Sequence, residues 1–180
     1  KARSLSSGFL CRENRMAKEF LTVMAVLDDE TQKTLFGWQQ AMLTAGLKGT
    51  QTMSIPFHIT LGSFAPDCEE ALLGRVRRAA EETAAFPIRF TAWNTFGRRV
   101  LFVQPDESFA LTALHGRFDR HEADPYPWTP HTTLFMGEEK EVEQAIEIVK
   151  PLFRPLHARI TAIELGFFFP HRFIGRYELK

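Results

Sequence analysis

Two short motifs carry residue types that can perform acid-base chemistry. His58 is followed by Thr60 in the segment His-Ile-Thr-Leu, and His131 is followed by Thr133 in the segment His-Thr-Thr-Leu. A neutral imidazole can take a proton from water or a sugar hydroxyl, and a protonated imidazole can give one to a leaving oxygen. Threonine hydroxyls can donate hydrogen bonds to the non-bridging oxygens of a phosphoryl group. Two such pairs therefore indicate displacement at phosphorus, with a base and an acid on opposite sides.

Each motif lies in a strand-like stretch, which places its two polar side chains together. Successive side chains of a strand point to opposite faces, so His58 shares a face with Thr60, and His131 with Thr133. The composition predicts about 0.05 chance copies of His-x-Thr-Leu, whereas the chain has two. The plainer reading is two half-buried strand histidines at duplicated positions. It is less favoured for a pair that lies inside a repeat.

Strand-like and helix-like patterns alternate along the chain. Apolar or alternating stretches predict strands over residues 19–27, 57–63, 88–95, 99–104, 130–136, 159–169 and 172–179. Apolar residues at helical spacing predict helices that begin near residues 28–30 and 67–70, and helices over 107–121 and 140–153. The order of elements in the first half is repeated in the second.

The two halves also resemble each other residue by residue. Residues 58–61 match residues 131–134 at an offset of 73, and residues 89–93 match residues 159–163 at an offset of 70. Similarity in the same order at a nearly constant offset indicates an internal duplication. We therefore expect a two-lobed, pseudo-symmetric domain in which both His/Thr pairs face one cleft between the lobes.

Length and charge bound the class of protein. A chain of 180 residues, with 44% hydrophobic and 24% charged residues, is typical of one globular domain. The first 15 residues hold four basic residues against one acidic residue, so they carry +3 and the other 165 residues carry −3. Such a body lacks the basic surface by which proteins hold long nucleic acid stably. A small or terminal phosphate is still an acceptable ligand.

The ends of the chain and its cysteines give further expectations. Met16 precedes a strand-like run, so residues 1–15 are expected to be a tag or upstream extension and residues 16–180 a single domain, with halves of about 19–97 and 99–169. No apolar stretch approaches the ~20 residues of a membrane span, so no membrane contact is expected. Two cysteines do not make a disulfide framework and favour a cytoplasmic setting. The expected oligomeric state is a monomer.

Four other residues are weaker candidates for substrate binding. Arg99 follows a Gly-Arg pair, Trp128 lies in a proline-rich entry to the second motif, and His171 and Arg172 follow a run of phenylalanines at a predicted turn. Aromatic and arginine side chains can stack on a base, and arginine can bind phosphate. Tight turns and core packing are the plainer explanations for these residues. No zinc-ligand or phosphate-loop spacing occurs, so neither a metal nor a cofactor is expected.

The paired motifs resemble those of the two-histidine (2H) phosphoesterase superfamily, which includes 2'-5' RNA ligase-like proteins and 2',3'-cyclic nucleotide phosphodiesterases. The hallmark of that superfamily is a His-x-Thr/Ser-hydrophobic motif in each half of the chain, and the similarity in element order covers about residues 17–178. The resemblance implies a bilobal α+β fold, with two mostly antiparallel sheets flanked by helices around a central cleft. Thr132 departs from the pattern, in which a larger apolar residue is usual. It is expected to loosen the core face of the second strand.

The resemblance also implies metal-independent chemistry on 2',3'-cyclic phosphates or 2'-5' phosphodiester linkages of nucleotides or RNA ends. One of His58 and His131 would act as base on water, and the other would protonate the departing ribose oxygen. Thr60 and Thr133 would bind the phosphoryl oxygens, and the pseudo-symmetry leaves the assignment of acid and base open. The reverse reaction would join RNA ends.

Two alternatives belong to other functional classes. A non-catalytic nucleotide- or phosphate-binding module on the same fold would bind nucleotide without turnover. A structural protein, whose motifs are relics of duplication, would have no saturable phosphate site. The enzyme is favoured because both His/Thr pairs are complete.

Overall fold

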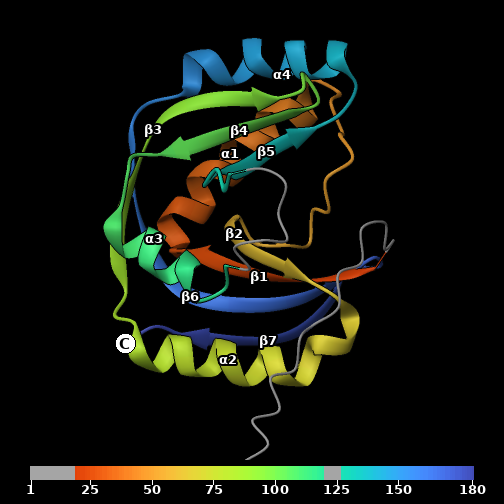
Figure 1. Ribbon diagram of the computed structural model, residues 1–180. Helices are drawn as coiled ribbons and strands as arrows, with labels where there is room; N and C mark the ends of the chain where they lie inside the picture. The colour runs from red at the N-terminus through yellow and green to blue at the C-terminus, as the bar shows by residue number, and fades with distance from the viewer. Residues whose placement is uncertain (1–18, 120–126) are drawn as a thin grey trace, which may run out of the picture.

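Helices and strands alternate in the computed structural model, which describes residues 19–119 and 127–180. The strands and helices of this part of the chain are β1 (Phe20–Leu27), α1 (Asp29–Thr44), β2 (His58–Phe64), a 3-10 turn (Pro66–Cys68), α2 (Glu69–Glu82), β3 (Phe86–Phe96), β4 (Val100–Pro105), α3 (Phe109–Gly116), β5 (Thr132–Met136), α4 (Glu139–Leu152), β6 (Leu156–Phe168) and β7 (Arg172–Glu178). The order β-α-β-α-β therefore occurs twice, and β7 follows the second copy. This α+β arrangement confirms the predicted fold class (Figure 1).

The sheet has the symmetry that the sequence repeat predicts. Its strand order is β2-β1-β6-β3-β4-β5, with β7 paired to β6, and every pairing is antiparallel. The order reads the same from both ends when β1, β2 and β3 are matched to β4, β5 and β6. At its centre Ile88 pairs with Ala158, and these two residues are separated by the same 70 positions as the repeat. The last strand of each half thus pairs with the first strand of the other half.

The prediction of two separate sheets needs one correction. Strands β3 and β6 pair directly from Phe86↔Ile160 to Phe90↔Leu156. The two lobes are therefore parts of one continuous seven-stranded sheet. The 13-residue strand β6 is long enough to pair with β3 along its first part and with β1 along the rest, which is why no break occurs between the lobes.

Capping residues explain where two of the helices begin. The carboxylate of Asp28 accepts hydrogen bonds from the backbone N–H of Thr31 (3.0 Å) and of Arg159 (2.6 Å), so it starts α1 and ties it to β6. At α4, Glu138 and Glu141 form a reciprocal capping box. Both helices begin within two residues of the positions that the sequence predicts.

The predicted helix over residues 107–121 is too long. Ser108 caps its start by accepting from the backbone N–H of Leu111 (3.3 Å), and the helix ends at Gly116. Glycine has the poorest helix propensity after proline, and turn hydrogen bonds follow it, such as Phe118 N–H to the His115 carbonyl (2.7 Å). Residue 121 and the predicted extension, residues 1–15, lie outside the described residues.

The two faces of the sheet have different roles. Figure 1 shows α2 along the lobe formed by β1, β2, β6 and β7, and α4 along the lobe formed by β3, β4 and β5. On β1, Leu21, Val23 and Ala25 belong to the main apolar core, whereas Thr22 faces a cavity.

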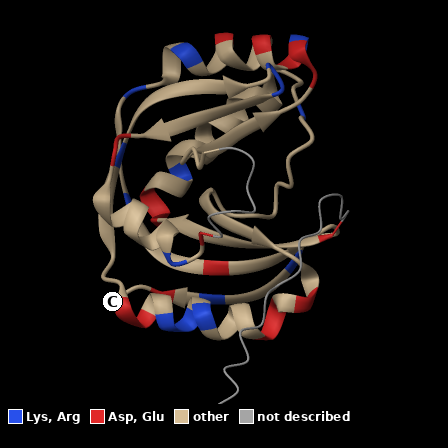
Figure 2. Ribbon diagram, viewed as in Figure 1, with Lys and Arg blue, Asp and Glu red and all other residues tan. Residues whose placement is uncertain are grey.

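Figure 2 shows charged residues concentrated along α2 and α4. Among the described residues, no helix is both long and apolar enough to cross a membrane.

Candidate active site

Side-chain hydrogen bonds join β2 to β5 and to the segment before β5, and these two strands are the ends of the strand path. The Thr132 hydroxyl donates to the His58 carbonyl (3.0 Å), and the Trp128 indole N–H donates to the Thr60 carbonyl (2.9 Å). Carbonyls two residues apart point to the same side of a strand, so both acceptors lie on the edge of β2 away from β1. These two hydrogen bonds hold the two His/Thr motifs beside each other.

Trp128 is itself held by packing. Its ring stacks on His115, with centroids 3.8 Å apart and planes at 7°, and His115 Nδ1 donates to the Leu61 carbonyl (2.9 Å). A carbonyl can only accept, so this contact also fixes the proton on Nδ1. Trp128 does not line the cavity described below. Its contacts support core packing over the base stacking considered from the sequence.

Thr132 contradicts the expectation that it loosens the second motif strand. Its side chain is fully buried (0% exposed), and its hydroxyl has a partner on the facing motif. A buried hydroxyl that is hydrogen-bonded adds a directional contact where a larger apolar residue would add only packing. Thr132 therefore ties the two strands together.

The Thr132→Val variant tests this contact. Valine keeps the shape but removes the donor, so we expect the free energy of unfolding to fall by about 1–3 kcal/mol as the His58 carbonyl loses its partner. Urea denaturation of wild type and variant at one pH measures the difference. Thr112→Val, at an exposed position of α3, is the matched control and should change stability by less than about 0.5 kcal/mol. Equal stability of Thr132→Val and wild type would contradict the bond's role.

The two motif histidines have equivalent backbone partners. His58 Nδ1 lies 2.7 Å from the Pro56 carbonyl, and His131 Nδ1 lies 2.8 Å from the Thr129 carbonyl, in each case two residues earlier. Nδ1 must donate in both contacts, because the carbonyl oxygen only accepts. Nε2 of each ring is then left to exchange a proton with a ligand. The pseudo-symmetry of the sheet thus extends to the tautomers of the two histidines.

Burial keeps both rings neutral near pH 7. It lowers the pKa of His58 to about 4; the Pro56 carbonyl opposes this shift, and the charges of His131 and His171 add to it. Burial also lowers the pKa of His131, against the opposing effect of the Thr129 carbonyl. The rings of Phe96 and Phe102 lie 4.8 and 5.1 Å from the His131 ring. Such apolar surroundings disfavour the charged imidazolium.

A cavity of about 940 Å³ lies over the motif face of the sheet. Its walls include His58, Thr60, Thr133 and His171, four of the site residues that the sequence predicts. His131 is not among the lining residues, but it packs on Phe102, the register partner of Thr133. The cavity is therefore bordered by the first His/Thr pair and by the threonine of the second.

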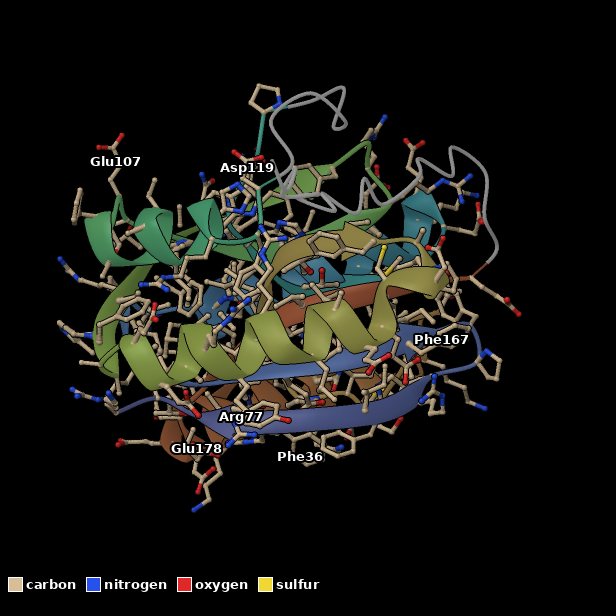
Figure 3. The ribbon with its side chains drawn as sticks, turned by 60° about the horizontal axis from the view of Figure 1, so that its bottom comes forward. Phe36, Arg77, Glu107, Asp119, Phe167 and Glu178 are labelled. Carbon is tan, nitrogen blue, oxygen red and sulfur yellow. The ribbon has the colours of Figure 1, made fainter. Side chains whose placement is uncertain are left out.

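Several lining residues were not predicted from the sequence. They are a carboxylate, two cations and five phenylalanines: Glu164, Lys33, Arg176, Phe20, Phe36, Phe168, Phe169 and Phe173. Phe36, which Figure 3 labels, comes from α1, and Phe173 and Arg176 come from β7, so elements far apart in the sequence line the same cavity. One signal was available, because Glu164 is an acidic residue inside an otherwise apolar stretch of β6.

Two other predicted binding residues are engaged elsewhere. Arg99 forms an ion pair with Glu138, and Arg172 forms one with Glu69 (2.6 Å) while its guanidinium lies 5.2 Å from the Phe167 ring. Neither arginine lines the cavity. The structure therefore does not bring Arg99, Arg172 or Trp128 to the site. No group of three or more His, Cys, Asp or Glu side chains within the described ranges is arranged to hold a metal ion.

Comparison with known proteins places the chain in a family. A family model described as "2'-5' RNA ligase superfamily" matches residues 27–166, which include both motifs. The chain belongs to this superfamily. Membership of the 2'-5' RNA ligase superfamily confirms the resemblance found from the paired motifs. A search of curated proteins found no match.

Solved structures share the fold of this 2'-5' RNA ligase superfamily member. Escherichia coli LigT in its apo form matches with a TM-score of 0.61 at 16% identity, over 90% of this chain and 98% of LigT. A crystal structure described as a phosphoesterase gives 0.64 at 17% identity, over 90% and 99% of the two chains. The protein TT0787 of Thermus thermophilus gives 0.60 at 17% identity, over 89% and 97%. At these identities the likeness establishes the fold.

Proposed function

We propose that the protein is a metal-independent phosphodiesterase that acts on 2',3'-cyclic phosphate or 2'-5' linkages of nucleotides or RNA ends. The observation that supports this most is the pairing of the two motifs. Two histidines have equivalent Nδ1–carbonyl contacts, and a hydrogen bond joins the two motifs that contain them. His58, Thr60 and Thr133 line one cavity, and His131 packs on Phe102, the register partner of Thr133. This set contains an acid, a base and two hydroxyl donors for the phosphoryl oxygens.

The mechanism uses the two histidines in opposite protonation states. Neutral His58 Nε2 takes a proton from water as the water oxygen forms a bond to phosphorus. The bond from phosphorus to the 2' or 3' ribose oxygen breaks, and protonated His131 gives its Nε2 proton to that oxygen. Thr60 and Thr133 donate to the non-bridging oxygens, where charge accumulates. We assign the base to His58 because burial lowers its pKa to about 4, so the ring is neutral above that pH.

A related fold is known to accept nucleotides. Escherichia coli LigT has been crystallised in complexes with ATP, NADP+, 3'-AMP and phosphate. The cavity of the present protein offers aromatic rings for a base and hydroxyl groups for a phosphate. A nucleotide or an RNA terminus is therefore the proposed ligand.

Turnover of 2',3'-cyclic nucleotides tests the proposal, and its pH dependence tests the mechanism. We expect ³¹P NMR to show conversion to a nucleoside monophosphate in the presence of EDTA. The value of kcat/KM should fall as pH drops through the His58 pKa, near 4, because the base becomes protonated. It should also fall as pH rises above the His131 pKa, which lies below 6.5, because the acid loses its proton. The optimum is therefore expected between about pH 4 and 6.5.

Three results would count against this function. Loss of turnover in EDTA would show that a metal takes part. A rate that is constant from pH 4 to 8, where chemistry limits, would exclude opposite roles for two histidines. Nucleotide binding without turnover would identify the protein as a binding module on the same fold.

A further inference from the structure

Glu164 is a carboxylate on the floor of the cavity that has no hydrogen-bond partner among the described residues. Its side chain is only 5% exposed, and burial raises its pKa, an effect that the charge of Arg176 opposes. Within the described residues, Glu164 has no hydrogen bond or ion pair. Arg176 instead places its Nε 2.8 Å from Glu178. A nearly buried carboxylate without donors is costly, which points to donors that a ligand brings.

The imidazole of His171, near Glu164, has a second polar atom without a partner in the described part of the chain. Its Nε2 is buried and has no hydrogen-bond partner among the described residues. The Nε2 atom would lie 3.3 Å from a Cβ placed on Gly166, so the ring folds over this glycine, and the ring centroids of His171 and Phe168 are 5.2 Å apart. Gly166 is two residues beyond Glu164 on β6 and therefore on the same face. Glu164 and His171 thus line the same region of the floor, where the Nε2 atom is enclosed by protein atoms and the Glu164 carboxylate is the group left for a ligand.

The sheet register fixes this region relative to the phosphate-binding threonine. Thr60 and Glu164 are both register partners of Met24, on opposite sides of β1. Two strand spacings separate them, which is about 10 Å between Cα atoms. This separation is suited to the two ends of one nucleotide, with its phosphate at Thr60 and its base at Glu164. Phe20 and Phe168, stacked 5.4 Å apart at this end of the cavity, offer ring surfaces for a base.

The chemistry of the Glu164 carboxylate selects one base. An ionised carboxylate repels phosphate and accepts two hydrogen bonds, so it matches neighbouring N–H donors. Guanine has such a pair, N1–H and the N2 amino group, next to the O6 acceptor. Adenine and cytosine place a ring-nitrogen acceptor beside their amino group, and uracil places its single N–H between two carbonyl oxygens. Of the four bases, only guanine presents two neighbouring N–H donors to a carboxylate.

We infer that Glu164 is the base-recognising residue of a guanine-binding subsite in the proposed phosphodiesterase site. The Glu164 carboxylate accepts from guanine N1–H and N2–H. The inference rests on the proposed function for its reaction, but it also predicts selective binding without any reaction. It makes the protein specific for guanosine 2',3'-cyclic phosphate or for RNA ends that terminate in guanosine.

Substrate analogues test the subsite without any change to the protein. We expect kcat/KM for guanosine 2',3'-cyclic phosphate to exceed the values for the adenosine, cytidine and uridine compounds by at least about tenfold. The inosine compound lacks the N2 amino group and should lose a large part of this advantage. Equal values for guanosine and the other three substrates would overturn the subsite while leaving the phosphodiesterase activity established.

Binding and a variant give a second, independent test. Calorimetry with the 3'-monophosphates of guanosine, inosine and adenosine is done on His131→Ala, which cannot turn ligand over by the proposed route. We expect guanosine to bind at least about tenfold more tightly than adenosine, and Glu164→Gln in the same background to remove most of this preference. Glu107→Gln is the matched control, at an exposed position on the far edge of the molecule from Phe36 (Figure 3).

The outcomes separate the two proposals. Guanosine-selective binding without turnover in wild type would support the subsite and overturn the phosphodiesterase. Unselective binding, or a preference that survives Glu164→Gln, would overturn the subsite alone. Absence of both binding and turnover would overturn both. If Glu164→Gln does not fold, as judged by its melting curve, the comparison of guanosine with inosine on the unchanged protein decides.

Discussion

Replacement of either motif histidine by alanine is expected to reduce kcat for 2',3'-cyclic nucleotides by about 10²–10⁴-fold, the usual contribution of a general acid or base. The two rings are the only groups that we assign to proton transfer, and each has its Nδ1 committed to a backbone carbonyl. Alanine removes Nε2 while the preceding carbonyls of Pro56 and Thr129 stay in place. The measurement is single-turnover hydrolysis followed by ³¹P NMR.

A substrate that needs no acid distinguishes the roles of His58 and His131. With a 4-nitrophenyl nucleotide diester, the departing phenolate is stable without a proton. We therefore expect His131→Ala to recover most of its activity on this substrate and His58→Ala to recover little. Recovery by His58→Ala in its place would reverse the assignment of acid and base.

The control for these variants is His157→Ala. His157 is exposed on β6 and is paired in register with Arg89 of β3, away from the cavity lining. Its activity and melting temperature should match those of wild type. Loss of activity in this variant would show that removal of any histidine disturbs the enzyme.

The pH profile adds a further distinction between the two histidine variants. His58→Ala should lose the acid limb of the profile, because the group that is inactivated by protonation near pH 4 has gone. His131→Ala should lose the alkaline limb, because the group that must be protonated, and whose pKa burial lowers, has gone. Retention of both limbs in either variant would mean that another residue titrates.

Local patterns predicted the parts of the fold that depend on local physics. Strand alternation placed His58 and Thr60 on one face, with Ile59 and Leu61 on the other, and the structure has these last two in the apolar core. The repeat offset of 70 predicts that β3 and β6 are equivalent strands of the two halves. The pairing of Ile88 with Ala158, which are 70 positions apart, agrees with this equivalence. Such features follow from side-chain periodicity, which the sequence contains directly.

Features that depend on tertiary contacts were beyond the sequence patterns. The donation from Thr132 to the His58 carbonyl joins residues 74 positions apart and arises only when the sheet curves until its ends meet. The pairing of β3 with β6 into one sheet is of the same kind. Glu164 can be recognised in the sequence as an acidic residue in an apolar strand. That it has no hydrogen-bond partner among the described residues follows only from the folded surroundings.

Loss of the motif hydroxyls is the second change for which we expect a large effect. Thr60→Val and Thr133→Val should each reduce kcat by about 10²–10³-fold, by analogy with the removal of one donor from an oxyanion site. Thr60→Val leaves the backbone carbonyl that accepts from Trp128 in place, so the link between β2 and β5 is retained. Serine at either position should restore most of the activity, because it returns the hydroxyl.

The shape of the pH profile separates this role from that of the histidines. A threonine hydroxyl does not titrate between pH 4 and 8, so both limbs should stay in place in Thr60→Val while the whole curve drops. If the hydroxyls bind the ground state and the transition state equally, KM rises and kcat is unchanged; if they act on developing charge, kcat falls. Because charge accumulates on the non-bridging oxygens only as the water oxygen attacks, we expect the loss in kcat. A change confined to KM would show that Thr60 and Thr133 hold the substrate without stabilising the transition state.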